Sequence, residues 1–218
     1  MIALIRYALS MLVRGQAYIA PFVLFGTAIV VLTTNDLGPI TGTYSACALT
    51  QFVCGLWFTV AIVNTEDRAQ RSMTVVAARG QRRVLVANAL AATVVTGGLT
   101  AIGVAYPVYS GTHVVTAVDL AVGALAQLVC GVAGVAVGLL CSRVVIPKAG
   151  YAVFASLAAI GALTMIPPVP PVSPVMALLS RPEPAGRMLA PIAAFGAFAL
   201  AMLVASVLIT EQVARRQD

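Results

Sequence analysis

The side chains with the most evident chemistry lie in one polar segment, residues 64–83, between two long apolar runs. The segment begins with acidic residues, continues with arginines and carries apolar residues at helical spacing, which is typical of a short amphipathic helix. Such a helix binds a partner protein by placing its apolar stripe in a groove. The residues expected to carry this docking are Glu66, Asp67, Arg68, Arg71, Met73, Val76 and Arg79. The alternative is a solvated loop that only anchors the topology.

The ends of this helix are predicted from residue types as well. Asn64 or Thr65 is expected to be the N-cap, with Glu66 and Asp67 in the first turn, where the helix dipole favours carboxylates. Gly80 is expected at the C′ position, because glycine adopts the left-handed conformation there without strain. The apolar stripe between these ends consists of Ala69, Met73, Val76 and Ala77.

Three further polar side chains fall within apolar runs, where they are costly and usually face a bundle interior, a cavity or a partner. Asp119 is either a contact in a substrate path, which includes a site for a cationic substrate, or an outer-interface residue if its span begins after it. Gln51 and Gln127 are also candidates for the substrate path, although a glutamine in a span more often makes a hydrogen bond between helices.

The residues needed for catalysis or metal binding do not form a recognisable set. His113 is the single histidine, and no two cysteines form a C-x-x-C pair. Neither a G-x-S-x-G nucleophile motif nor a G-x-x-x-x-G-K-[ST] phosphate loop occurs. We therefore expect a non-catalytic chain with no metal site and no cofactor of its own. The four cysteines all fall within apolar runs: Cys47, Cys54, Cys130 and Cys141.

The elements that must position these residues are membrane helices. The chain is 61% hydrophobic and 9% charged, against about 25% charged residues in a soluble domain. Its net charge of +6 is thinly spread, which fits juxtamembrane arginines better than nucleic-acid binding. Lys148 is the only lysine, and the abundance of Ala, Val, Gly and Arg is typical of a GC-rich bacterial genome. The composition predicts an all-α, multi-pass protein of a bacterial plasma membrane.

Apolar runs long enough to cross about 30 Å of hydrocarbon recur along the chain. An open sheet edge cannot face lipid, so these runs are expected to be helices. Six spans are predicted, at residues 17–34, 43–63, 84–106, 114–141, 149–166 and 188–210. They form one transmembrane domain, residues 16–218, with an outer Pro-rich loop at residues 167–187.

Small residues predict where helices approach closely. Gly134 and Gly138 form a G-x-x-x-G pair in the fourth span, and Ala197, Ala201 and Ala205 repeat in the sixth. Both sets are expected to pack within the chain, with a dimer contact as the less favoured role.

The basic residues predict the orientation of the spans. All but two of the thirteen lie before span one, between spans two and three, between four and five, or after six; the exceptions are Arg181 and Arg187. By the positive-inside rule, both termini are expected in the cytoplasm.

Residues 1–15 form a separate predicted element. Arg6, Ser10 and Arg14 are spaced by four and share one helix face, opposite a mainly apolar face. This pattern indicates a helix lying in the membrane interface. The alternative is a simple extension of span one into the cytoplasm.

This architecture resembles the membrane subunit of an ABC-2-type exporter. An N-terminal amphipathic helix, six spans, cytoplasmic termini and a charged helix between spans two and three carry the resemblance. It implies that residues 66–80 are the coupling helix that contacts an ATP-binding subunit, and that residues 167–187 hold short re-entrant helices. In this chain the Pro-rich start of that loop favours an extended segment, with at most one or two helical turns near residues 175–180.

The resemblance further implies the partners. ATP and Mg²⁺ would be bound by a separate ATP-binding cassette subunit, and a second, identical or different membrane subunit would complete the pathway for an amphipathic or hydrophobic substrate moving outward. Two other classes stay open: an ATPase-independent carrier or channel, and an assembly or interaction subunit. The sequence does not name the substrate.

Overall fold

The computed structural model describes residues 1–34, 40–110, 115–166, 169–181 and 184–216, except the side chains of residues 68 and 149. All the regular secondary structure in this part of the chain is helical, so the predicted all-α class is confirmed. The helices are α1 (Ile2–Arg14), α2 (Ile19–Thr34), α3 (Ile40–Asn64), α4 (Arg68–Ala77), α5 (Gln81–Ser110), α6 (Ala117–Leu140), α7 (Ala149–Met165), α8 (Val172–Leu179) and α9 (Ala185–Arg215).

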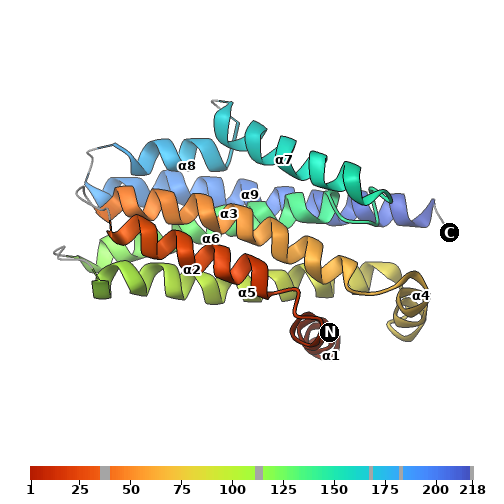
Figure 1. The fold of residues 1–218 in the computed structure, drawn as a ribbon. Helices are drawn as coiled ribbons and strands as arrows, with labels where there is room; N and C mark the ends of the chain where they lie inside the picture. Colours follow the sequence, from red (N-terminus) through yellow and green to blue (C-terminus); the bar gives the residue numbers. More distant parts are fainter. Residues whose placement is uncertain (35–39, 111–114, 167–168, 182–183, 217–218) are drawn as a thin grey trace.

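Most helices run alongside one another, while α1 and α4 turn across one end (Figure 1). The N- and C-terminal marks lie at this same end, together with the connection between α6 and α7. We call it the basic end, because it gathers the segments that hold all but two of the thirteen basic residues. The predicted clustering of basic residues at one end is thus confirmed, while its cytoplasmic location stays a prediction.

Four helices, α3, α5, α6 and α9, are long and apolar enough to cross a membrane. The bent pair α1–α2 adds a fifth candidate if it is one span. Helices α2 and α7 have 16 and 17 residues, about 24–26 Å at the usual rise per residue, which is short of about 30 Å of hydrocarbon. The structure therefore supports a multi-pass membrane protein with four or five spanning helices, and the count of six stays a prediction.

The first predicted element is a separate helix, as expected. Helix α1 meets α2 at an angle of 80° and does not extend it. Ala8 and Leu12 of α1 are buried against the bundle, whereas Arg6 and Arg14 are exposed. The break falls at residues 15–18, where Gln16 has a positive φ of 54°.

Helices α3 and α6 form the centre of the bundle, and glycines bring them together. A Cβ atom on Gly134 would overlap the carbonyl oxygen of Phe52, and one on Gly138 would lie 2.7 Å from the carbonyl oxygen of Leu56. The expected role of the G-x-x-x-G pair in packing within the chain is confirmed.

The alanine repeat of α9, unlike the glycine pair of α6, lies on the surface of the bundle. Ala197, Ala201 and Ala205 are all exposed, while Ala199 and Ser206 are the buried small residues of this helix. The expectation that the repeat packs within the chain is wrong. The repeat marks a face of α9 that no described helix covers.

The Pro-rich loop contains a helix of about two turns, as expected, but the helix begins earlier than predicted. Helix α8 spans eight residues, Val172–Leu179, and buries Val172, Val175 and Leu179 in the bundle. Pro174 is tolerated because it lies in the first turn, where the backbone N–H groups have no intrahelical partner. The expected extended segment is therefore shorter, and the helix begins earlier than near residue 175.

Candidate functional site

The candidate site is α4 with the residues that hold it at the basic end (Figure 1). Polar contacts hold residues 64–67, which lead into α4, and these contacts differ from the predicted N-cap. Asn64 Oδ1 accepts a hydrogen bond from the backbone N–H of Arg143 at 3.0 Å, and Thr65 Oγ1 donates to the carbonyl of Ala61 at 2.6 Å. Neither residue caps α4. The N-cap is Asp67, with extended backbone angles and no side-chain cap bond.

Glu66 has a defined role in this entry. Its Oε1 accepts a hydrogen bond at 3.0 Å from Oγ1 of Thr74, which lies in the second turn of α4. The carboxylate thus holds the connecting segment against the helix. A ten-residue helix is marginal on its own, so contacts of this kind contribute to its stability.

The exit of α4 is a Schellman motif displaced by one residue from the prediction. Arg79, not Gly80, occupies the left-handed C′ position, with φ 58°. The backbone N–H of Arg79 donates to the carbonyl oxygen of Val76 at 3.1 Å. The backbone N–H of Gly80 donates to the carbonyl oxygen of Val75 at 3.0 Å. Arg83 Nη1 donates to the carbonyl of Ala78 at 3.3 Å, which places a cation at the negative end of the helix dipole.

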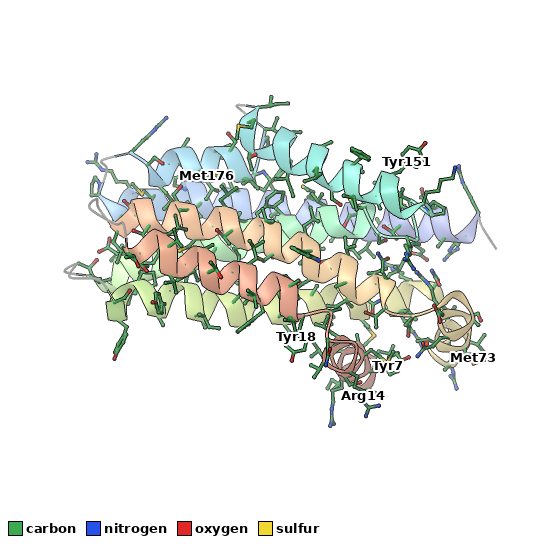
Figure 2. All side chains as sticks on the ribbon, in the orientation of Figure 1. Tyr7, Arg14, Tyr18, Met73, Tyr151 and Met176 are labelled. Atoms are coloured by element: carbon green, nitrogen blue, oxygen red, sulfur yellow. The ribbon has the colours of Figure 1, made fainter. Side chains whose placement is uncertain are left out.

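The apolar stripe of α4 faces away from the bundle. Met73 is 71% exposed and Val76 is 79% exposed, and Ala69 and Ala77 are exposed as well. Ala78 is buried on the opposite side. Figure 2 shows Met73 at the outer edge of the basic end. The helix therefore presents to its surroundings the residues that a soluble helix would bury.

The charged residues named for this site surround the stripe. Asp67 and Arg79 are exposed, while Glu66 and Arg71 are half-buried. Arg68 begins the helix, and its side chain lies outside the described residues. The structure thus brings the predicted docking residues together on one short helix and the segments directly before and after it.

Two hollows flank α4. A groove of about 770 Å³ separates it from α1, and a cavity of about 880 Å³ separates it from the α6–α7 connection. Among the described residues, Arg83 is the one charged side chain that lines the groove, whereas both carboxylates and guanidinium groups line the second cavity. Helix α4 consequently has few contacts with the bundle along its sides and is held mainly at its two ends.

Asp119 lies at the start of α6, where its carboxylate completes a capping box. Asp119 Oδ2 accepts from the backbone N–H of Thr116 at 3.0 Å, and Thr116 Oγ1 accepts from the N–H of Asp119 at 3.3 Å. This local role favours the interface alternative, since the carboxylate stabilises the helix end that contains it.

Gln51 and Gln127 are both fully buried in the centre of the bundle, but their bonding differs. Gln51 Nε2 donates to the carbonyl of Thr96 at 2.6 Å and to Thr100 Oγ1 at 3.3 Å, so its expected interhelical hydrogen bond is confirmed. Among the described residues, neither amide atom of Gln127 has a partner. The expected hydrogen bond of Gln127 is absent there.

The structure also shows how the cysteines are placed. All four are free and buried. Within the described residues no three His, Cys, Asp or Glu side chains approach as a metal site would require. His113 lies outside the described residues.

Sequence reasoning missed Glu211, which joins two helices near α4. It is 6% exposed and lies near the end of α9. Its carboxylate accepts a hydrogen bond from Arg215 of the same helix and lies 3.9 Å from Nε of Arg82 at the start of α5. The i,i+4 spacing of Glu211 and Arg215 was a usable signal for the first contact. The second depends on packing of distant segments.

Comparison with family models, with curated proteins and with solved structures finds no match to this chain.

Proposed function

We propose that this chain is the membrane subunit of an ATP-driven exporter, and that α4 is the coupling helix that docks on a separate ATP-binding subunit. That partner supplies the ATP and Mg²⁺ chemistry, and the membrane subunit is not itself an enzyme. The substrate is amphipathic or hydrophobic and moves outward across a bacterial plasma membrane. The resemblance described above supplies the substrate class, the direction and the location.

The observation that carries the proposal is the outward stripe of α4. A short helix is held in place at both ends, and its Met73 and Val76 are mostly exposed. Exposed apolar area of this kind is unfavourable unless something covers it. A groove on a partner protein covers such a stripe in the usual helix-in-groove manner.

The contacts of α4 offer a route for motion into the bundle. Its exit leads directly into α5, which is linked to α9 by Arg82 and Glu211. Tyr7 of α1 accepts a hydrogen bond from Gln70 of α4 at 2.9 Å. A displacement of α4 by its partner would thus reach α5, α9 and α1. Coupling requires that the two states of the ATPase interact differently with α4.

A second membrane subunit is part of the proposal. The exposed alanine repeat of α9 permits a close approach of another helix. A path for an amphipathic substrate would then form between two subunits. The companion is either an identical or a different chain.

The test is recovery of the partner from the native membrane. The tagged chain is purified in mild detergent, and the bound proteins are assayed for ATPase activity. We expect an ATP-binding subunit in stoichiometric amount, and at least about a tenfold loss of it with Val76→Asp, because a carboxylate in an apolar groove costs more than about 1.4 kcal/mol.

The matched control is Tyr109→Asp, which places the same charge on a side chain that is 91% exposed at the opposite end of the bundle. It should retain the ATPase. Recovery of no nucleotide-binding protein with the wild-type chain, or normal transport by Val76→Asp, would refute the exporter proposal.

The alternative function is an assembly or interaction subunit, which the same exposed stripe also supports, since docking alone needs no substrate path. An ATPase-independent carrier or channel is the third class. Substrate-dependent stimulation of the recovered ATPase separates the exporter from both.

A further inference from the structure

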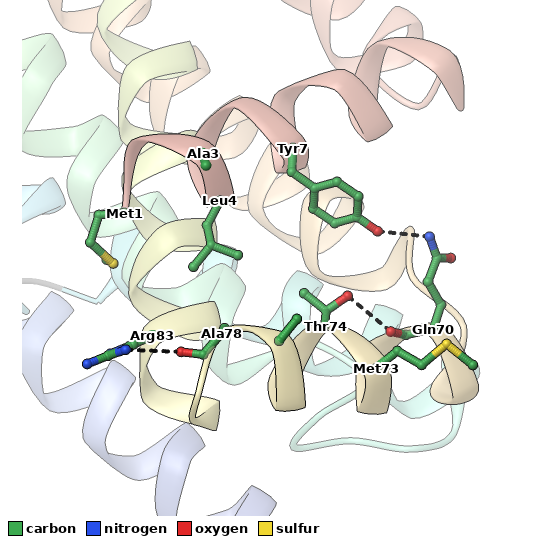
Figure 3. Close-up of a pocket in the computed structure, with 10 residues that line it drawn as sticks. Met1, Ala3, Leu4, Tyr7, Gln70, Met73, Thr74, Ala78 and Arg83 are labelled. Carbon is green, nitrogen blue, oxygen red and sulfur yellow. Dashed lines mark hydrogen bonds between the residues drawn. The ribbon is translucent and has the colours of Figure 1, made fainter.

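The groove between α1 and α4 has a shape suited to a chain-like ligand. Its volume is about 770 Å³. One wall is the face of α1 that carries Ala3, Leu4 and Tyr7, and the other is the side of α4 that carries Met73 and Ala77. Figure 3 shows Leu4 extending from α1 toward α4 across the groove. The middle of the groove is therefore apolar.

The two ends of the groove are polar and different. At one end, Gln70 Nε2 donates a hydrogen bond to Tyr7 Oη at 2.9 Å and bridges the two helices (Figure 3). At the other end lies Arg83, the one charged side chain among the described residues of the lining. An elongated ligand in this groove would place its apolar part between the helices and its polar part at Arg83.

Arg83 is available to an anion. Its Nη1 donates to the carbonyl of Ala78 at 3.3 Å, which uses one of the five N–H donors of a guanidinium group. The side chain is exposed, and no carboxylate of the described residues forms an ion pair with it. Arg79 and Arg82 are close to it in the sequence and are exposed as well, but neither lines the groove, and Arg82 is paired with Glu211. Guanidinium groups bind phosphate oxygens in bidentate fashion, so the charge favours a phosphate.

The position of α1 indicates where such a ligand comes from. The helix turns by 80° from α2 and exposes Arg6 and Arg14, while Ala8 and Leu12 pack against the bundle. A helix of this kind across the end of apolar helices lies at the boundary between acyl chains and headgroups. Basic pockets at this depth bind the headgroups of anionic lipids.

We propose that the α1–α4 groove binds one anionic phospholipid, with an acyl chain between Leu4 and Ala77 and its phosphate on Arg83. The bound lipid fills the space beside α4 and supports the helix from the side opposite the second cavity. The site depends on the protein lying in a membrane. It does not depend on an ATP-binding partner. Met73 and Ala77 belong both to the stripe and to the groove wall, but Leu4 and Arg83, which hold the lipid, lie outside the stripe. Val76 is not part of the groove lining.

The test measures lipid contact at Leu4. The single tryptophan is removed with Trp57→Phe, and Leu4→Trp is added as a reporter within the groove. The full chain is placed in vesicles with either phosphatidylglycerol or phosphatidylcholine brominated along the acyl chains, in a non-brominated background. We expect quenching by the anionic lipid at about fivefold lower concentration than by the zwitterionic lipid, the factor that corresponds to roughly 1 kcal/mol per arginine near the surface.

The variants locate the site. Arg83→Gln should abolish the preference for phosphatidylglycerol, whereas Arg181→Gln, an exposed arginine at the opposite end, should leave it unchanged. Native mass spectrometry of the chain with the natural Leu4 gives a second measurement, in which Arg83→Gln should retain one phosphatidylglycerol fewer than wild type.

Four results would overturn the proposal. Equal quenching by both lipids, or a preference that survives Arg83→Gln, would mean that the groove does not select an anionic lipid. Loss of the preference on addition of inorganic phosphate would assign Arg83 to a soluble phosphate. Protection of Leu4→Trp from both lipids in native membranes would mean that a protein segment fills the groove. An ATPase that fails to bind leaves each of these readouts unaffected.

Discussion

At the scale of single residues, the two buried glutamines show how the same side chain can have opposite effects. Gln51 is bonded through its Nε2 to α5, with only its Oε1 lacking a partner, while both amide atoms of Gln127 lack partners among the described residues. A buried polar group without a partner costs about 1–3 kcal/mol, whereas removal of a bonded one leaves its partners unpaired. The two positions should therefore respond differently to the same substitution.

We predict that Gln127→Met stabilises the bundle by about 1–3 kcal/mol, because methionine has a similar length and no polar atom to satisfy. Gln51→Met is the matched control and should destabilise it by about 1–2 kcal/mol. The measurement is the free energy of unfolding in detergent. Destabilisation by Gln127→Met would mean that its amide binds a water molecule or substrate, and would restore this residue to the predicted substrate path.

At the scale of helices, the close contact between α3 and α6 and the residues at the end of α4 decide how the helices are arranged. Helices α3 and α6 touch through glycines, and the carbonyls of Phe52 and Leu56 occupy the space that a Cβ atom would need. Directly after α4, Arg79 has backbone angles in the left-handed region, although the next residue, Gly80, could adopt these angles without strain. A non-glycine residue there is strained by roughly 1 kcal/mol, which the contacts of α4 must offset.

We predict that Gly134→Ala destabilises the protein by about 1–3 kcal/mol, since α6 must move away from α3 to admit the methyl group. Gly161→Ala in α7 is the control, because a Cβ atom there meets nothing within 4 Å. It should be neutral or slightly stabilising, as alanine favours helix. Thermal unfolding in detergent compares the two, and equal midpoints would contradict the close packing of α3 and α6.

At the scale of the whole molecule, the outer surface is strongly apolar. Side chains of α2, α7 and α9 that are 40–79% exposed include Phe22, Val23, Phe154, Leu157, Met165 and Val204. Large apolar side chains face outward where lipid surrounds a protein. The alanine repeat of α9 forms a regular small-residue face on this surface, and it suits a helix of another subunit better than disordered acyl chains.

We predict that Ala201→Cys forms a cross-linked dimer in native membranes on mild oxidation, because the alanine repeat allows two helices to approach closely. Phe154→Cys on α7 is the control and should stay monomeric, since it lies on a bulky surface. Cross-linking is followed by mass on a non-reducing gel. A band heavier than the monomer but different from the dimer identifies a heteromeric partner, and equal cross-linking at Phe154→Cys would refute an interface on α9.

The sequence by itself determined the helical class, the separate α1, the amphipathic α4 and the gathering of basic residues at one end. These features follow from composition and from periodicity within one segment, which local chemistry controls. Only the tertiary structure decided that the stripe of α4 points outward, that the repeat of α9 is exposed, that Glu211 approaches Arg82 and that Gln127 has no partner within the described part of the chain. The reason is physical: an apolar or small-residue face is visible in a sequence, but which neighbour covers it depends on packing between segments far apart in the chain.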